Sequence, residues 1–126
     1  MSMSNLVREP EIWVSMCRRF PWVVEERGEF GDGLVHLDFA ALRRGVEKAA
    51  DSGGVSTASD ILAFVEDLLE KVDTLHPEVV GALDISFLED LYLAEPHQRD
   101  FAVPLLQPKS KARWKEVSDA YDRLSG

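Results

Sequence analysis

Apolar residues recur every three or four positions between residues 57 and 93, in two stretches that His76 and Pro77 separate. Such spacing is typical of amphipathic α-helices. In the first stretch the apolar positions share one side of a helical wheel: Ile61, Phe64, Val65, Leu68, Leu69, Val72 and Leu75. The acidic positions share the other side: Asp60, Glu66, Asp67, Glu70 and Asp73. Because proline suits the first position of a helix, Pro77 predicts a restart as an antiparallel neighbour.

The pattern therefore predicts a central helical hairpin over about 57–93, with Leu68 and Phe87 buried between its two helices. The acids of the second helix are Glu78, Asp84, Glu89 and Asp90. Asp84 is unusual because it lies among apolar positions on the wheel. It predicts either a kink after Gly81 or a buried carboxylate that needs a basic partner. The basic residues expected for that role are Arg43, Arg44 and Arg99.

The rest of the chain also predicts helices and requires no strand. The expected helices are Pro10–Phe20, Trp22–Arg27, Leu34–Ala50, a short one near 97–103, and Lys109–Leu124. Thr57 and Asp60 have the spacing of a capping box at the start of the central helix. Gly28, Gly31 and Gly33 predict a loop and lack the spacing of a phosphate-binding motif. We expect one all-α domain over residues 1–126, an irregular bundle or short stack of hairpins with about six helices, in which residues 1–9 are flexible.

Charge is distributed unevenly along the 126 residues, whose formal net charge is −9. Residues 56–100 hold eleven acidic side chains against Lys71 and Arg99, so this third alone carries −9. Such a field repels nucleic acid and anionic membranes and attracts basic partners. The single cysteine, Cys17, excludes an internal disulfide, and the N-terminal residues lack an export signal. We therefore expect a cytoplasmic protein that binds neither nucleic acid nor a membrane.

Residues with catalytic or ligand-binding potential are scattered rather than clustered. No histidine has a partner at helical spacing for a metal site, so we expect caps or surface residues at His36, His76 and His97. The aromatic residues near the N-terminus predict core packing: Trp13, Phe20 and Trp22. The basic residues around Trp114 predict a solvated helix face: Lys109, Lys111, Arg113 and Lys115. We expect no catalytic activity, no metal and no cofactor.

The segment from Glu78 to Leu91 resembles a bacterial family of small acidic helical proteins of unknown function. That family is marked by a long acidic helix and a Val/Ile-Ser-Phe-Leu-Glu-Asn/Asp-Leu segment. The similarity extends upstream to the Leu34–Val46 helix and downstream to the last helix, over about two-thirds of the chain. It departs at Asp84, where the family has an apolar or small residue, and at the glycine-rich loop. Because such proteins are often encoded beside secreted polymorphic toxins, the resemblance implies an immunity protein that binds and neutralises a toxin.

The resulting hypothesis is an acidic binding protein that occludes a basic toxin domain in the cytoplasm. Two groups of carboxylates are the expected partner-binding residues: Glu66, Asp67, Glu70 and Asp73 on the first helix, with Glu89 and Asp90 on the second. An exposed acidic face attracts a basic protein surface. The alternative is a structural or adaptor module, or a homodimer, in which the acidic face serves solubility only.

Overall fold

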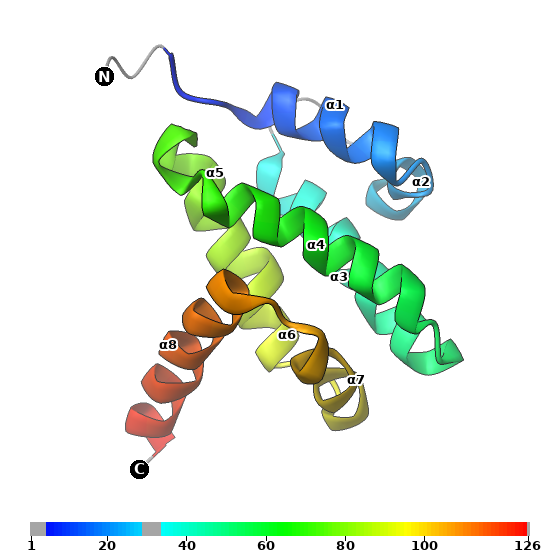
Figure 1. The fold of residues 1–126 in the computed structure, drawn as a ribbon, viewed down its shortest axis with the longest axis vertical. Coiled ribbons are helices and arrows are strands. Elements are labelled where there is room, and N and C mark those ends of the chain that lie inside the picture. The colour runs from blue at the N-terminus through cyan, green and yellow to red at the C-terminus, as the bar shows by residue number, and fades with distance from the viewer. Residues whose placement is uncertain (1–4, 29–33, 126) are drawn as a thin grey trace.

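The computed structural model describes residues 5–28 and 34–125, and these residues form helices (Figure 1). The α-helices are α1 (Glu9–Arg19), α2 (Val23–Arg27), α3 (Val35–Ser52), α4 (Val55–Glu70), α5 (Pro77–Ala82), α6 (Asp90–Tyr92), α7 (Pro96–Ala102) and α8 (Pro108–Ser125). A π-helical segment, Leu83–Glu89, joins α5 to α6, and 3₁₀ turns lie at Val72–Thr74 and Val103–Leu105. The expected all-α fold of about six helices is confirmed.

Helix α3 is the centre of the fold, since α1, α2, α4, α5, α7 and the π-helical segment all pack against it. The prediction that the segments 57–73 and 77–92 pack mainly against each other is wrong, because both pack chiefly on α3. The close antiparallel pair is instead α3 and α4, which run along the same diagonal in Figure 1. Helix α8 contacts α4 and the π-helical segment and then extends away from the bundle.

The turn between α3 and α4 explains this pairing. Gly53 has φ +75°, the left-handed conformation that glycine adopts without strain, and it ends α3. Helix α4 then begins at Val55, directly after Gly54, without a side-chain cap. The predicted capping box of Thr57 and Asp60 is therefore wrong. The short turn at Gly53 and Gly54 makes α3 and α4 a helical hairpin, in which α4 runs antiparallel to α3.

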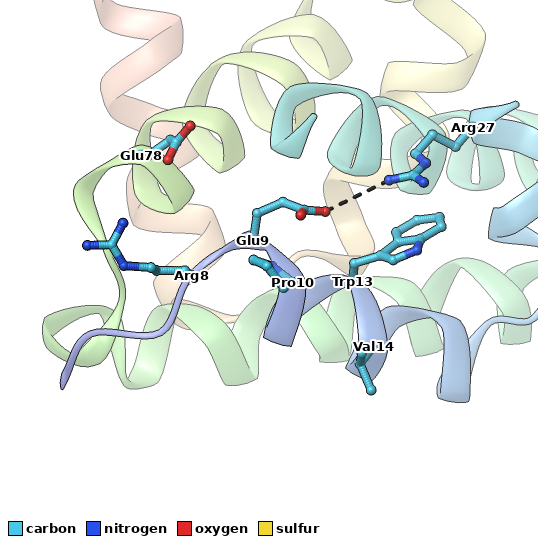
Figure 2. A pocket seen from close by; sticks show the side chains of 7 residues that line it. All are labelled: Arg8, Glu9, Pro10, Trp13, Val14, Arg27 and Glu78. Carbon is cyan, nitrogen blue, oxygen red and sulfur yellow. Dashed lines mark ion pairs between the residues drawn. The ribbon is translucent and has the colours of Figure 1, made fainter. Parts of the chain in front are cut away.

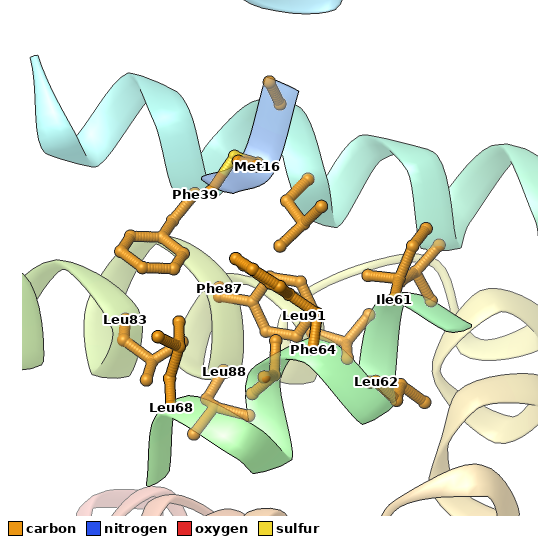
Figure 3. Packing of buried hydrophobic residues seen from close by; sticks show 14 of the residues in the cluster. Met16, Phe39, Ile61, Leu62, Phe64, Leu68, Leu83, Phe87, Leu88 and Leu91 are labelled. Carbon is orange, nitrogen blue, oxygen red and sulfur yellow. The ribbon is translucent and has the colours of Figure 1, made fainter. Parts of the chain in front are cut away.

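The core lies between α3, α4 and the π-helical segment (Figure 3). Leu68 and Phe87 are both buried, at 4% and 0% exposure, as their spacing predicted. Phe20 is buried and the two N-terminal tryptophans pack against the core, which confirms the structural interpretation of these aromatics. The buried apolar residues form one continuous hydrophobic cluster.

The N-terminal segment before α1 is tied to the bundle from Val7 onward. The Val7 amide donates a hydrogen bond to the Thr74 carbonyl, and the His76 amide donates to the Val7 carbonyl, each at 2.8 Å. Glu9, the first residue of α1, is buried. The flexibility expected for residues 1–9 stays a prediction, and residues 1–4 and the loop expected at 29–33 lie outside the described residues.

Candidate functional site

Three carboxylates form an exposed surface along α4 and the 3₁₀ turn that follows it. Asp67, Glu70 and Asp73 are exposed, and we call them the α4 acidic face. They point outward because the apolar positions on the opposite side of the same helix are buried in the core: Val65, which precedes them, and Leu68, which lies among them. Three of the expected partner-binding residues thus lie on one accessible surface.

Only one carboxylate of the α4 acidic face forms an ion pair within the described parts of the protein. Asp67 lies 3.6 Å from the Arg19 guanidinium of α1, and both side chains are largely exposed. Such a pair contributes little to stability. Within residues 5–28 and 34–125, no ion pair involves Glu70 or Asp73. Their charge is therefore available to a partner.

Glu66 does not belong to that face, and its predicted exposure is wrong. It is only 3% exposed and points at the first turn of α8. Its carboxylate accepts hydrogen bonds from the backbone amides of Lys109 (2.8 Å) and Ser110 (2.9 Å) and from the Ser110 hydroxyl (2.9 Å). Burial alone would raise the pKa of Glu66, but these hydrogen bonds outweigh it and lower the pKa. Glu66 is thus a cap that docks α8 onto α4.

Glu89 lies beside Tyr121 in the later turns of α8, whereas Glu66 of α4 meets the first turn of α8. Glu89 and Asp90 are half-buried, and Glu89 accepts a 2.8 Å hydrogen bond from the Tyr121 hydroxyl. Since Tyr121 lies about three turns beyond Ser110 along α8, the two predicted acidic groups do not form one surface. Of the six expected partner-binding residues, only the three of the α4 acidic face are exposed.

Asp84 has the basic partner expected for it, but the partner is a different residue and the carboxylate is not buried. Its two carboxylate oxygens each accept a 2.8 Å hydrogen bond from Arg113 of α8, so the predicted partners Arg43, Arg44 and Arg99 are wrong. The carboxylate is partly exposed, with a side-chain exposure of 36%. The helix also changes geometry beside it, because the π-helical segment begins at Leu83. The wider π turn shifts the following residues relative to an α-helical wheel.

A second site, which the sequence reasoning missed, is a pocket between α1, the end of α2 and the start of α5 (Figure 2). Its floor holds Glu9, which points toward Arg27 at 3.8 Å. Arg27 also donates a 2.7 Å hydrogen bond to the fully buried Asp38 of α3 and lies 3.8 Å from the centre of the Trp13 ring. Three segments of the chain are thus joined by one cluster of buried charges.

The electrostatics of this cluster are unusual because two carboxyls share one guanidinium. Burial raises the pKa of Asp38 to about 7, the adjacent Glu9 carboxyl adds to the shift, and Arg27 opposes it. Burial also raises the pKa of the nearby Cys17 thiol, which favours its protonated form. A signal for the cluster exists in the sequence, since Asp38 interrupts the apolar stripe of Val35, Phe39 and Leu42.

The histidines occupy capping and surface-pairing positions. His76 accepts a hydrogen bond from the Glu78 amide and caps α5, as expected. His36 lies 2.7 Å from the Ser86 hydroxyl, and His97 lies 2.7 Å from Asp51 at the surface. Across the described ranges, no three His, Cys, Asp or Glu side chains are grouped so as to hold a metal ion. Over the same ranges, no helix has the length and apolarity of a membrane span.

Comparison with known proteins adds a family but no activity. The family model described as Domain of unknown function (DUF7674) matches residues 16–122, which include the α4 acidic face and Asp38. Neither the curated proteins nor the solved structures give a match. Functional inference therefore depends on the geometry of the two sites.

Proposed function

This chain belongs to the family described as Domain of unknown function (DUF7674), and we propose that it is an acidic binding protein whose α4 acidic face contacts a basic protein surface. The observation that carries the proposal is the exposure of Glu70 and Asp73, which have no ion-pair partner among the described residues. Unpaired surface charges of one sign steer an oppositely charged protein toward the face that carries them.

We further propose that the partner is a bacterial toxin domain, neutralised in the cytoplasm by occlusion. The support is the resemblance to small acidic proteins encoded beside polymorphic toxins, together with the concentration of negative charge in residues 56–100. In this mechanism the carboxylates bind lysine or arginine side chains of the toxin, and apolar residues at the centre of the interface supply most of the affinity. The protein acts by covering the toxin and performs no chemistry itself.

The test compares two triple charge reversals with the parent protein. The first variant replaces the α4 acidic face: Asp67→Lys, Glu70→Lys and Asp73→Lys. The control replaces three exposed acids on other helices: Glu11→Lys, Glu25→Lys and Glu116→Lys. Both change the net charge equally, and exposed substitutions shift stability by only about ±0.5 kcal/mol each.

Each protein is co-expressed with a candidate toxin domain chosen from the genes that neighbour its own. We expect the control to protect the cells and to co-purify with the toxin domain, whereas the α4 variant does neither while keeping its helical circular dichroism. Full protection by the α4 variant at parental expression level would mean that the acidic face serves solubility only.

A second candidate function is an adaptor or homodimer, which an apolar groove beside α8 favours. The groove has a volume of about 550 Å³, and its lining includes Val103, Pro108, Ala112 and Trp114. Apolar grooves of this kind mark association sites. Light scattering across a concentration series separates the two functions, because dimerisation through α8 doubles the measured mass. The Ala112→Glu variant should then remain a monomer.

A further inference from the structure

Helix α8 carries the groove described above on its outer side, together with a row of exposed charges. The lining of the groove follows the helix for about three turns, from Pro108 to Asp119. Lys111, Ala112, Lys115 and Asp119 are all exposed along it. Because α8 extends away from the bundle, this side of the helix is open to another molecule (Figure 1).

The charges along α8 oppose the dipole of the helix. The basic residues precede the acidic ones: Lys109, Lys111, Arg113 and Lys115 come before Glu116, Asp119 and Asp122. A helix is stabilised by the opposite order, with acids near its N-terminus and bases near its C-terminus. On the inner side Glu66 and Asp84 compensate for this order, because they bind the amide of Ser110 and the guanidinium of Arg113.

The outer charges of α8 have little such compensation. Among residues 5–28 and 34–125, Lys111 and Asp122 form no ion pair. Lys115 and Asp119 pair with each other along the same helix, at 3.9 Å, and both are exposed. An exposed pair of this kind contributes little to stability. The outer side of α8 therefore presents two lysines followed by two aspartates, all accessible to a partner.

This order of charges is complementary to itself when a second copy of the helix runs antiparallel. The four residues share one side of α8, because their spacings of four, four and three match the helical period. About a two-fold axis level with residue 117, Lys111 of each copy lies opposite Asp122 of the other, and Lys115 lies opposite Asp119. Each pair then occurs twice, as an interface between identical surfaces requires.

We propose that the groove beside α8 binds α8 of a second copy of this chain, antiparallel, through two Lys111–Asp122 pairs and two Lys115–Asp119 pairs. A parallel arrangement would place lysine beside lysine, which the repulsion of like charges disfavours. The antiparallel arrangement also sets the negative end of each helix dipole beside the positive end of the other. The proposal rests on the homodimer given above as the second candidate function, and it does not depend on the toxin.

The lining of the groove suits this occupant. Ala112 and Ser118 have short side chains, so the axes of two helices can approach closely at these positions. Val103 and Trp114 add apolar surface, whose burial supplies affinity that exposed ion pairs alone do not. The apolar surface therefore holds the second copy, and the charges determine its direction.

Two charge-reversed variants test the arrangement. The first combines Lys111→Glu with Lys115→Glu, and the second combines Asp119→Lys with Asp122→Lys. All four positions are exposed, and the new charges follow the order that the helix dipole favours. Both variants should therefore keep the helical circular dichroism and the urea midpoint of the parent, so that a lost dimer is not the result of unfolding.

Two control variants change the net charge equally at exposed positions on other elements. Arg18→Glu with Lys71→Glu matches the first variant, and Glu11→Lys with Glu25→Lys matches the second. Masses are measured by light scattering across a concentration series at an ionic strength of about 0.15 M, where distant charges are screened. We expect the parent and both controls to dimerise, and each α8 variant alone to self-associate about tenfold more weakly or less.

The decisive sample is an equimolar mixture of the two α8 variants. It should dimerise with the affinity of the parent, because every carboxylate in the mixed dimer again lies opposite an ammonium group. A mixture that stays monomeric beside a dimeric parent would overturn the proposal. A dimer that persists in each variant alone would also overturn it, while leaving the homodimer candidate standing through another surface. A parent that is monomeric at every concentration would overturn both, and protection from the toxin is tested separately by co-expression.

Discussion

Replacing Glu66 by alanine is expected to cost about 2–3 kcal/mol of unfolding free energy, although sequence pattern places this residue on an exposed acidic surface. The substitution removes the acceptor of three hydrogen bonds of 2.8–2.9 Å from the start of α8. Two backbone amides and the buried Ser110 hydroxyl then lose their partner. Helix caps contribute about 0.5–2 kcal/mol, and hydrogen bonds to charged groups contribute about 1.5–3 kcal/mol.

The measurement is urea unfolding at pH 7, followed by circular dichroism, for Glu66→Ala and for Glu70→Ala as the control. Glu70 lies one turn further along α4 but is exposed, so its replacement should change stability by about ±0.5 kcal/mol at most. A loss below about 0.5 kcal/mol for Glu66→Ala would refute the capping role. It would also return Glu66 to the set of residues available to a partner.

The same variant has a defined pH dependence. Because the pKa of Glu66 is lowered in the folded protein, its contribution is fully present above the ordinary value of 4.5 and is lost as pH falls through the folded pKa. The stability difference between parent and Glu66→Ala should therefore shrink on acidification below pH 4.5. A difference that stays constant down to the acid limit of folding would contradict the hydrogen-bonded carboxylate.

Three further predictions concern the core and the buried charges. Phe87→Ala removes a fully buried ring and should lower the unfolding free energy by about 3–5 kcal/mol in the same urea assay, whereas a parental midpoint would contradict its burial. Gly45→Ala would place a Cβ in steric conflict with the Trp22 ring and should cost about 1–3 kcal/mol, whereas Gly81→Ala, with open space around its Cβ, should gain up to about 1 kcal/mol. Because the folded pKa of Asp38 is raised to about 7, parental stability should fall as pH rises from 4 to 7, and Asp38→Asn should flatten that slope in urea unfolding at pH 5 and pH 8.

The helical structure and most of the buried positions could be predicted because both depend on the local spacing of apolar residues. The spacing of Ile61, Val65 and Leu68 determines which side of α4 is buried whatever packs on it. Pro77 and Gly53 likewise end or restart helices through their own backbone preferences. These features need no knowledge of distant parts of the chain.

The errors arose where a distant segment decides the environment of a residue. Glu66 lies at the edge of the apolar stripe, and only the arrival of α8, more than forty residues later, buries it. Asp84 likewise pairs with Arg113, which also belongs to the distant helix α8. The buried charge cluster of Glu9, Arg27 and Asp38 depends on contacts between α1, α2 and α3, which no helical wheel of a single segment can reveal.

The most direct test of the proposed function is the association rate with the purified toxin domain, measured for the parent and the two triple-lysine variants as ionic strength rises. The Debye length falls from about 30 Å at 0.01 M to about 8 Å at 0.15 M, so electrostatic steering weakens over this range. The account predicts fast, strongly salt-dependent association for the parent and for the Glu11, Glu25 and Glu116 control. It predicts slow association with little salt dependence for the Asp67, Glu70 and Asp73 variant. Equal rates and equal salt dependence for all three proteins would contradict binding through the α4 acidic face.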